Sequence, residues 1–150
     1  MLQTNYSIRE VRNETEKKDA LRVRRLVFIN EQQVPEEIEV DEHDAENSET
    51  VHFVAYKANE PVAAGRLRNY AQGIGKVERV AVLSSERGTG LGKQMMQAIE
   101  QSAVRLGYST LKLNAQYHAK AFYENLGYTA AGELFVEAGI DHIAMEKKLC

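Results

Sequence analysis

A glycine-rich segment in the middle of the chain constrains its fold more than any other feature. The run Arg87-Gly88-Thr89-Gly90-Leu91-Gly92 follows a strand-like stretch and precedes a stretch with helical periodicity. Glycine lets the backbone adopt positive φ and approach a ligand closely, and the free N–H groups at a helix start attract anions. The run therefore predicts a strand, a phosphate-binding turn and a helix in succession, with Arg87 adding a fixed positive charge.

Two common nucleotide-binding patterns do not fit this run. A Walker A loop requires Gly-x4-Gly-Lys-Ser/Thr; Gly92 and Lys93 match its end, but Arg87 and Gln94 do not match the rest. A dinucleotide fingerprint requires Gly-x-Gly-x-x-Gly, and Lys93 stands where its last glycine is needed. These mismatches argue against a nucleotide triphosphatase and against a dinucleotide-binding enzyme.

The rest of the chain predicts one mixed α/β domain spanning residues 1–150. We expect strands at 7–11, 51–57, 62–69, 74–82, 110–114, 128–135 and 142–147, and helices at 14–30, 91–106 and 117–126. Residues 36–49 contain eight acidic side chains and are expected to form a loop or a short helix.

Composition excludes several classes of protein. The formal net charge is −3 and no basic stripe is present, which argues against nucleic-acid binding. No apolar stretch approaches the ~18 residues that a membrane span needs, and residues 1–6 carry neither the basic start nor the apolar run of a signal peptide. The single cysteine, Cys150, cannot form an internal disulfide, so we expect a cytoplasmic protein. The histidines lack a metal-binding spacing, so no metal is expected.

Two motifs resemble the GNAT superfamily of N-acetyltransferases. Arg87, Gly90 and Gly92 fill its Arg/Gln-x-x-Gly-x-Gly/Ala pattern, and residues 119–128 are similar to its second signature, Ala-x-x-Phe-Tyr-x-x-x-Gly-Phe/Tyr. The residues from Val27 to Gln32 and from Val40 to Asp44 resemble the ElaA-like and YjcF-like branch. The resemblance implies an α/β GNAT fold: a central twisted, mostly antiparallel sheet of six to seven strands with flanking helices and a splay between strands 4 and 5.

The same resemblance implies the reaction and its partners. An acetyl group would move from acetyl-CoA to a small-molecule or peptide amine, by direct transfer in a ternary complex. A non-catalytic module that senses acetyl-CoA is the alternative, and a homodimer remains open. The residues that would bind acetyl-CoA are Val80, Ala81, Val82, Arg87, Gly88, Thr89, Gly90, Leu91, Gly92, Lys93, Asn114 and Tyr123.

An amine is mostly protonated at neutral pH and must lose a proton to attack the thioester. Glu78 is the first candidate for the base, since strand alternation puts it on the face of Val80 and Val82; pairing with a neighbouring arginine is its alternative role. Asn114 stands where many relatives carry a glutamate, and an amide cannot act as a base.

The resemblance places Tyr123 as the proton donor to the leaving thiolate, with core packing as its alternative role. On the acceptor side, the expected residues are Phe28, Glu31, Asp41, His43 and Asp44. The acidic segment 36–49 favours a cationic acceptor. An acyl-cysteine at Cys150 is not expected, because terminal residues are usually mobile.

Overall fold

The computed structural model describes residues 5–149. Residues 1–4, on which the expectation of no signal peptide partly rests, lie outside the described residues. So does Cys150, at which no acyl-cysteine was expected. Within residues 5–149 no helix is long and apolar enough to cross a membrane.

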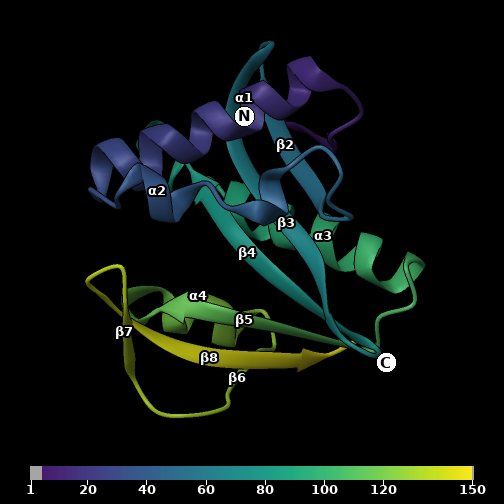
Figure 1. Cartoon of the computed structure of the whole chain (residues 1–150), viewed down its shortest axis with the longest axis vertical. Helices are drawn as coiled ribbons and strands as arrows, with labels where there is room; N and C mark the ends of the chain where they lie inside the picture. The colour runs from purple at the N-terminus through teal and green to yellow at the C-terminus, as the bar shows by residue number, and fades with distance from the viewer. Residues whose placement is uncertain (1–4, 150) are drawn as a thin grey trace.

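The helices and strands follow one another along the chain in much the order expected (Figure 1). The helices are α1 (Glu14–Arg24), α2 (Glu36–Glu39), α3 (Leu91–Arg105) and α4 (Lys120–Asn125). The strands are β1 (Ser7–Glu10), β2 (Val51–Lys57), β3 (Glu60–Ala71), β4 (Ile74–Val82), β5 (Thr110–Gln116), β6 (Thr129–Ala130), β7 (Phe135–Glu137) and β8 (Ile140–Lys148). A π-helical segment (Arg25–Glu31) continues α1, and 3-10 turns occupy Glu42–Asp44, Ser84–Glu86 and Tyr117–Ala119.

All strands join one sheet in the order β1-β2-β3-β4-β5-β8-β6, with β7 also paired to β8. Among residues 5–149, β4 and β5 run parallel and every other pairing is antiparallel. The expected mixed fold is confirmed, with eight strands where six to seven were expected.

The extra strand arises because the expected continuous strand at 128–135 is wrong. Ala130 pairs with Met145 and Phe135 pairs with His142, so five steps along this segment face three along β8. The two surplus residues cannot be accommodated in the ladder: Ala131 N–H still donates to the Ala144 carbonyl, and residues 132–134 loop out.

The sheet opens between β4 and β5, as the splay predicted. The two strands pair only through Ile74–Val77 and Thr110–Leu113, and beyond these residues they diverge (Figure 1). A bulge in β4 lies at the point of divergence: Arg66 pairs with Glu78 and Ala64 with Ala81, so β4 has one extra residue. Arg79 sits in this bulge with φ 57°, a left-handed conformation that is unusual for a non-glycine residue.

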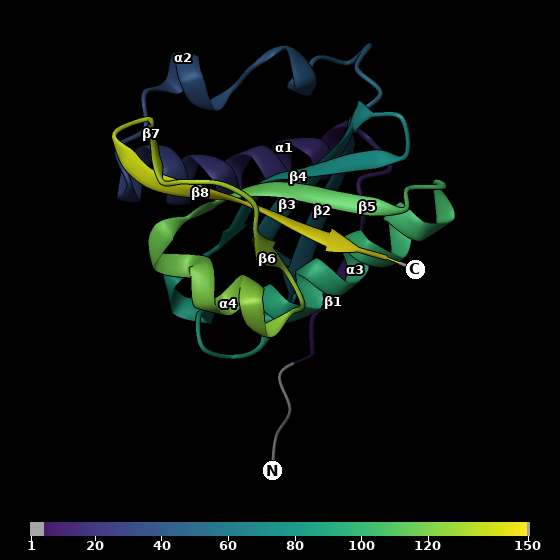
Figure 2. The same ribbon diagram turned by 90° about the horizontal axis from the view of Figure 1, so that it is seen from below.

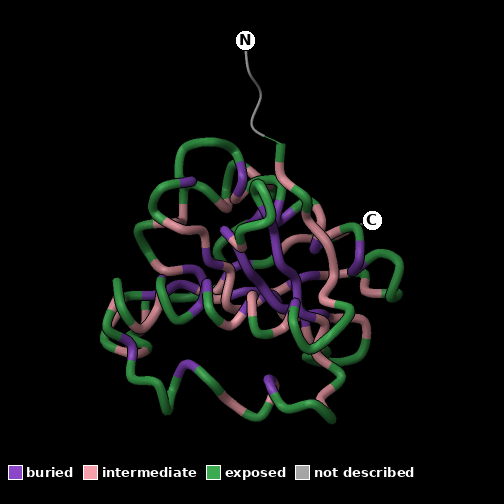
Figure 3. The backbone as a smooth tube through the Cα atoms, turned by 90° about the horizontal axis from the view of Figure 1, so that it is seen from above, coloured by how far each residue is buried: buried purple, intermediate pink, exposed green. Residues whose placement is uncertain are grey.

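Helices cover both faces of the sheet, with α1 and α2 on one side and α3 and α4 on the other (Figure 2). The α3 side contains the larger core, which includes Leu91, Met95 and Ile99. The α1 side contains a smaller core around Val23 and Val27. Burial is therefore concentrated in the central strands that separate the two layers (Figure 3).

A buried network of charges joins the acidic segment to the sheet on the α1 side. Arg24 and Arg66 are 1% and 0% exposed. Asp44 Oδ1 lies 2.6 Å from Arg24 Nη1 and 3.0 Å from Arg66 Nη1, while Glu39 binds Arg24 and Asp41 binds Arg66. Burial alone would raise the pKa of Asp44, but the hydrogen bonds and charges of the two arginines lower it well below its usual range.

Asp44→Asn should lower the free energy of unfolding by about 3 kcal/mol, because breaking a buried ion pair leaves uncompensated charge. Urea denaturation at pH 7 measures this. The control is Glu36→Gln, which removes an exposed ion pair with Arg25 and should cost less than about 1 kcal/mol. Equal losses in the two variants would contradict a stabilising role for the network.

Candidate active site

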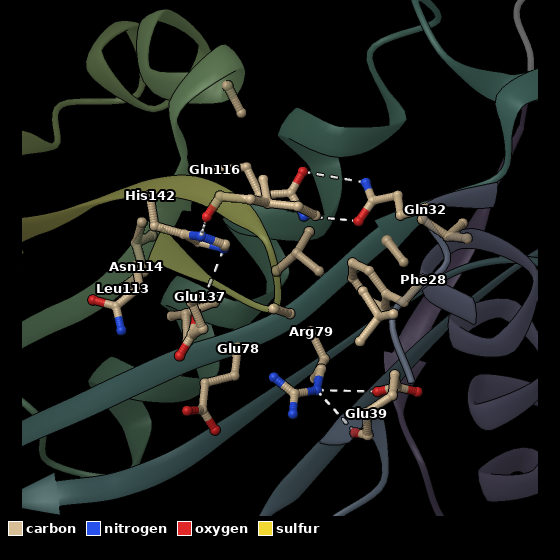
Figure 4. A pocket seen from close by; sticks show the side chains of 18 of the residues that line it. Phe28, Gln32, Glu39, Glu78, Arg79, Leu113, Asn114, Gln116, Glu137 and His142 are labelled. Atoms are coloured by element: carbon tan, nitrogen blue, oxygen red, sulfur yellow. Dashed lines mark hydrogen bonds and ion pairs between the residues drawn. The ribbon is translucent and has the colours of Figure 1, made fainter. Parts of the chain in front are cut away.

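A cavity of about 590 Å³ occupies the opening between β4 and β5 (Figure 4). This volume lies within the range of ligand-binding pockets. One wall comes from the π-helical segment and α2, the floor from β4 and β5, and the far wall from the β7–β8 hairpin. The expected site residues that line it are Phe28, Glu31, Glu78, Val80, Ala81, Val82, Arg87, Asn114 and Tyr123.

The cavity has chemically distinct faces because neighbouring strand residues point to opposite sides of the sheet. Val80, Val82 and Tyr123 pack against the core on the α3 side. Asn114 and Gln116 alternate with the buried Leu113 and Ala115, so they point to the α1 side. A ligand lying between the strands would thus contact one set of residues from each side.

Glu78 lies on the α1 face, opposite Val80 and Val82. The expectation that these three residues share a face is wrong, because the bulge at Arg79 breaks the alternation. Glu78 Oε1 lies 2.9 Å from Arg66 Nη2 and 2.9 Å from Arg68 Nε.

Lys76 Nζ completes this shell of cations, 3.1 Å from Glu78 Oε2. Burial alone would raise the pKa of Glu78, but the hydrogen bond from Arg68 and the charges of Arg66, Lys76 and Arg68 lower it to about 2. Such a carboxylate is a weak proton acceptor at neutral pH, and the alternative role, pairing with arginine, describes its contacts.

Tyr123 extends from α4 into the cavity between two aromatic neighbours. Its ring makes edge contacts with Phe122 and Tyr128, at centroid distances of 5.0 and 5.9 Å. Its hydroxyl has no hydrogen-bond partner among residues 5–149, and burial raises its pKa to about 12. The hydroxyl is therefore protonated at neutral pH and available to donate a hydrogen bond.

Of the residues expected on the acceptor side, Phe28 and Glu31 line the cavity, whereas Asp41, His43 and Asp44 do not. Asp41 and Asp44 bind Arg66, and Asp41 also lies 3.4 Å from Arg79. His43 lies beside Glu42, away from the cavity. Asp41 and Asp44 therefore fasten the acidic segment to the sheet. The sequence did not predict this role, because the arginine partners of the two residues are distant in sequence.

The glycine-rich loop connects the end of β4 to α3. Gly88 and Gly90 have φ of 80° and 90°, and an added Cβ at either would meet no atom within 4 Å. The backbone N–H groups of Gly88, Gly90, Gly92 and Lys93 have no acceptor in the part of the chain that the structure describes. The loop therefore presents free donors in open space, as an anion-binding turn requires.

Side chains on both flanks hold this loop in place. Thr89 Oγ1 donates to the Glu86 carbonyl at 2.7 Å. The guanidinium of Arg87 does not point into the loop: it binds Glu31 at 2.6 and 2.8 Å and donates to the Val82 carbonyl at 3.1 Å. Arg87 thus links the cofactor side expected from the sequence to the acceptor side.

Sequence reasoning missed the residues that close the cavity. Gln32 and Gln116 exchange two amide hydrogen bonds of 3.2 and 2.8 Å across it (Figure 4). His142 and Glu137 face each other on the far wall. Gln32 and Gln116 are 84 residues apart, and no spacing rule connects such positions before the fold is known.

The contacts of Glu78 predict how stability depends on pH. Glu78→Gln should lower the free energy of unfolding at pH 7 by about 1–3 kcal/mol, the usual cost of losing a charged, buried hydrogen-bond partner. The folded-state pKa of Glu78 is lowered, so its stabilisation is present above about pH 4.3, the unfolded value, and is lost as pH falls towards 2.

Urea denaturation should therefore show a smaller difference between wild type and Glu78→Gln at pH 3 than at pH 7. Glu133→Gln, at an exposed loop position, is the control and should change stability little at either pH. A difference for Glu78→Gln that grows on acidification would contradict the ion-pair geometry.

Comparisons with known proteins agree with this geometry. The profile of the acetyltransferase (GNAT) domain matches residues 12–149. YjcF of Bacillus subtilis (strain 168), described as an uncharacterized N-acetyltransferase, is 44% identical over 137 residues, covering 91% of this chain and 95% of YjcF.

Two solved structures share the fold. Escherichia coli ElaA superposes with a TM-score of 0.83 at 23% identity, over 97% of this chain and 100% of ElaA. An aminoglycoside 6′-N-acetyltransferase complexed with coenzyme A has a TM-score of 0.75 at 20% identity, over 96% of this chain and 97% of that enzyme. The domain match and the identity to YjcF confirm the resemblance found in the sequence: the chain belongs to the GNAT family of acetyltransferases.

Proposed function

We propose that this protein transfers an acetyl group from acetyl-CoA to an amine by direct attack in a ternary complex. The observation that carries the proposal is a cavity between two diverging strands that extends to Arg87, the residue at which a loop of free N–H donors begins. A long, thin substrate with an anionic end fits this shape, and the CoA bound by the related aminoglycoside acetyltransferase has that form.

Each part of acetyl-CoA has a matching feature. The pyrophosphate would accept hydrogen bonds from the loop between Arg87 and Lys93, at the N-terminus of α3. The pantetheine arm would pair with the edge of β4 from Val80 to Val82, which β5 leaves free. The thioester would then reach Asn114 and Tyr123, which line the cavity.

In the proposed reaction, the amine and the leaving thiolate would contact residues on opposite sides of the sheet. The amine would enter from the α1 side, against Phe28 and Glu31, and attack the thioester carbon as the C–S bond breaks. Tyr123 would donate a hydrogen bond to the developing thiolate. Its pKa of about 12 exceeds that of a thiol, about 8.5, so stabilisation of the thiolate is favoured over complete proton transfer.

The alternative, a module that binds acetyl-CoA without catalysis, predicts CoA binding without turnover. Release of CoA from acetyl-CoA in the presence of an amine panel separates the two. We favour the enzyme because the Tyr123 hydroxyl, which has no hydrogen-bond partner among residues 5–149, lies in the cavity. A module that only binds acetyl-CoA would not require a hydrogen-bond donor there.

Gly90→Val should abolish most of the rise in melting temperature that CoA causes by mass action, because the side chain would occupy the space of the pyrophosphate. Gly107→Val is a matched control. Gly107 lies at the other end of α3, with φ 92° against 90° for Gly90 and equally open surroundings.

Both substitutions should cost about 1–2 kcal/mol, the usual strain of a left-handed residue, but only Gly90→Val should lose the response to CoA. Differential scanning fluorimetry with and without CoA measures both effects. An unchanged CoA response in Gly90→Val would show that the pyrophosphate binds elsewhere.

Tyr123→Phe keeps the aromatic packing and removes the hydroxyl. It should lower kcat about 10- to 100-fold, at or below the low end of general acid catalysis, since a thiolate is a fair leaving group. CoA affinity should be nearly unchanged. Tyr117→Phe, which alters an exposed ring outside the cavity, is the control. A wild-type kcat in Tyr123→Phe, when chemistry limits the rate, would assign Tyr123 to packing alone.

A further inference from the structure

The cavity contains one carboxylate that is not bound by an arginine or a lysine. Four carboxylates line it: Glu31, Glu39, Glu78 and Glu137. The first binds Arg87, the second binds Arg24 and Arg79, and the third is surrounded by three cations. In the part of the chain that the structure describes, the basic side chain that contacts Glu137 is His142, whose Nε2 lies 3.7 Å from Glu137 Oε2. A proton acceptor for the amine is therefore best sought at this pair.

The geometry of His142 fixes which ring nitrogen can accept a proton. Its Nδ1 lies 2.7 Å from the Ile140 carbonyl oxygen, which can only accept a hydrogen bond. In the neutral ring the proton is thus on Nδ1, and Nε2 carries the lone pair. His142 is only 7% exposed and lines the cavity, so Nε2 has few competitors for its lone pair (Figure 4).

The β7–β8 hairpin accounts for this arrangement. Ala138 and Gly139 both have positive φ, as a two-residue hairpin turn requires. The resulting register pairs Phe135 with His142 and Glu137 with Ile140, which makes Glu137 a diagonal neighbour of His142 on the same face. The Phe135 ring stacks on the imidazole, with centroids 5.8 Å apart, and restrains its orientation.

The imidazole also faces the side from which the acceptor would enter. Gln116 is the partner of His142 across β5 and β8, so the two side chains share a face with Asn114. His118, the other histidine that lines the cavity, is exposed, and its Nε2 lies 2.7 Å from Gln116 Oε1. The titratable groups around His142 are thus Glu137 and, beyond Gln116, His118.

We propose that Nε2 of His142 accepts the proton of the attacking amine, and that Glu137 stabilises the imidazolium that forms. This inference rests on the proposed acetyl transfer. The amine nitrogen forms its bond to the acetyl carbon, the C–S bond breaks and the electron pair leaves with the thiolate. The surplus N–H proton of the amine moves to Nε2, the thiolate takes a proton from solvent, and the imidazolium returns its proton to solvent.

Two variants of His142 separate basicity from structure. Asn in place of His142 can keep the hydrogen bond to the Ile140 carbonyl through its Nδ2, and Gln can place its amide near the position of Nε2. Neither side chain is basic. His118→Asn is the control from the same cavity, and Glu78→Gln tests the base expected from the sequence.

Initial rates of CoA release from acetyl-CoA between pH 6 and 9.5 measure the effect. The probe acceptors are 2-phenylethylamine, which suits the apolar residues Phe28, Val34, Ile38 and Ile140 of the cavity wall, and spermidine. His142→Asn and His142→Gln should both lower kcat/KM about 10²–10³-fold at pH 7, within the range of general base catalysis, with partial recovery at high pH. His118→Asn changes a cavity-lining histidine that the proposed proton transfer does not use, and should lower kcat/KM far less than either His142 variant.

Glu137→Gln should lower kcat/KM about 2- to 10-fold, since the base remains but its imidazolium is less stabilised. The acid limb of its pH profile should move to lower pH. A substitution with a merely structural effect would lower the rate without moving the limb.

A direct measurement does not depend on turnover. In ¹H–¹⁵N spectra of the histidine rings, assigned with His142→Asn, the neutral ring of His142 should carry its proton on Nδ1, with CoA present or absent. A ring protonated on Nε2, or a wild-type rate in both His142 variants, would overturn the proposal. So would an acid limb that Glu78→Gln removes and His142→Asn retains.

These outcomes are separate from failure of the proposed function. If the wild type binds CoA but acetylates no amine in a broad panel, the proposed function fails and the role of His142 fails with it. If the wild type turns over and the His142 variants do so equally well, only the assignment of the base fails.

Discussion

The side chain of Arg66 is the interaction on which the arrangement of the site depends. It is fully buried, and its guanidinium binds Asp41 and Asp44 from the acidic segment and Glu78 from β4. A buried charge is tolerated only where its partners are held in place. Arg66 thus ties the acidic segment, residues 36–49, to β4, which borders the cavity. Asp44 and Glu78 meet at this side chain although their positions in the chain differ by 34.

The bulge at Arg79 makes that arrangement possible. In a regular strand Glu78 would share a face with Val80 and point away from Arg66. The extra residue turns Glu78 towards Arg66, leaves Val80 against the core beneath α3, and lies where β4 departs from β5. The left-handed conformation of Arg79 costs about 1–2 kcal/mol, and its hydrogen bonds to Glu39 help to offset this. One distortion therefore completes the ion network and opens the cavity.

The features of the site that neighbouring residues determine were predicted from the sequence, and those that depend on residues distant in sequence were not. The glycine-rich loop and α3 were predicted because positive φ and free N–H groups follow from neighbouring residues. Tyr123 was expected at the site because the second signature, residues 119–128, is a local pattern of α4 and the residues on either side of it. The side to which Glu78 points was predicted wrongly, because nothing in Glu78-Arg79-Val80 signals a bulge to a reader of the sequence alone. His142 and Glu137 were missed because they come together only through the register of β7 and β8, which pairs Glu137 with Ile140 and makes it a diagonal neighbour of His142.

The same distinction applies to charge. Eight acidic residues within positions 36–49 suggested an electrostatic attraction for cationic acceptors, but Glu36, Glu39, Asp41 and Asp44 are each paired with an arginine in the folded chain. Paired charges produce a field that falls off quickly with distance, and the carboxylate of Glu137, whose side chain is 54% exposed, is screened by solvent except against a group in close contact with it. The electrostatic environment of an incoming amine is thus set by the few groups that line the cavity without a counter-charge, not by the total charge of the nearest segment. Glu137, with only an imidazole beside it, is the carboxylate that meets this condition.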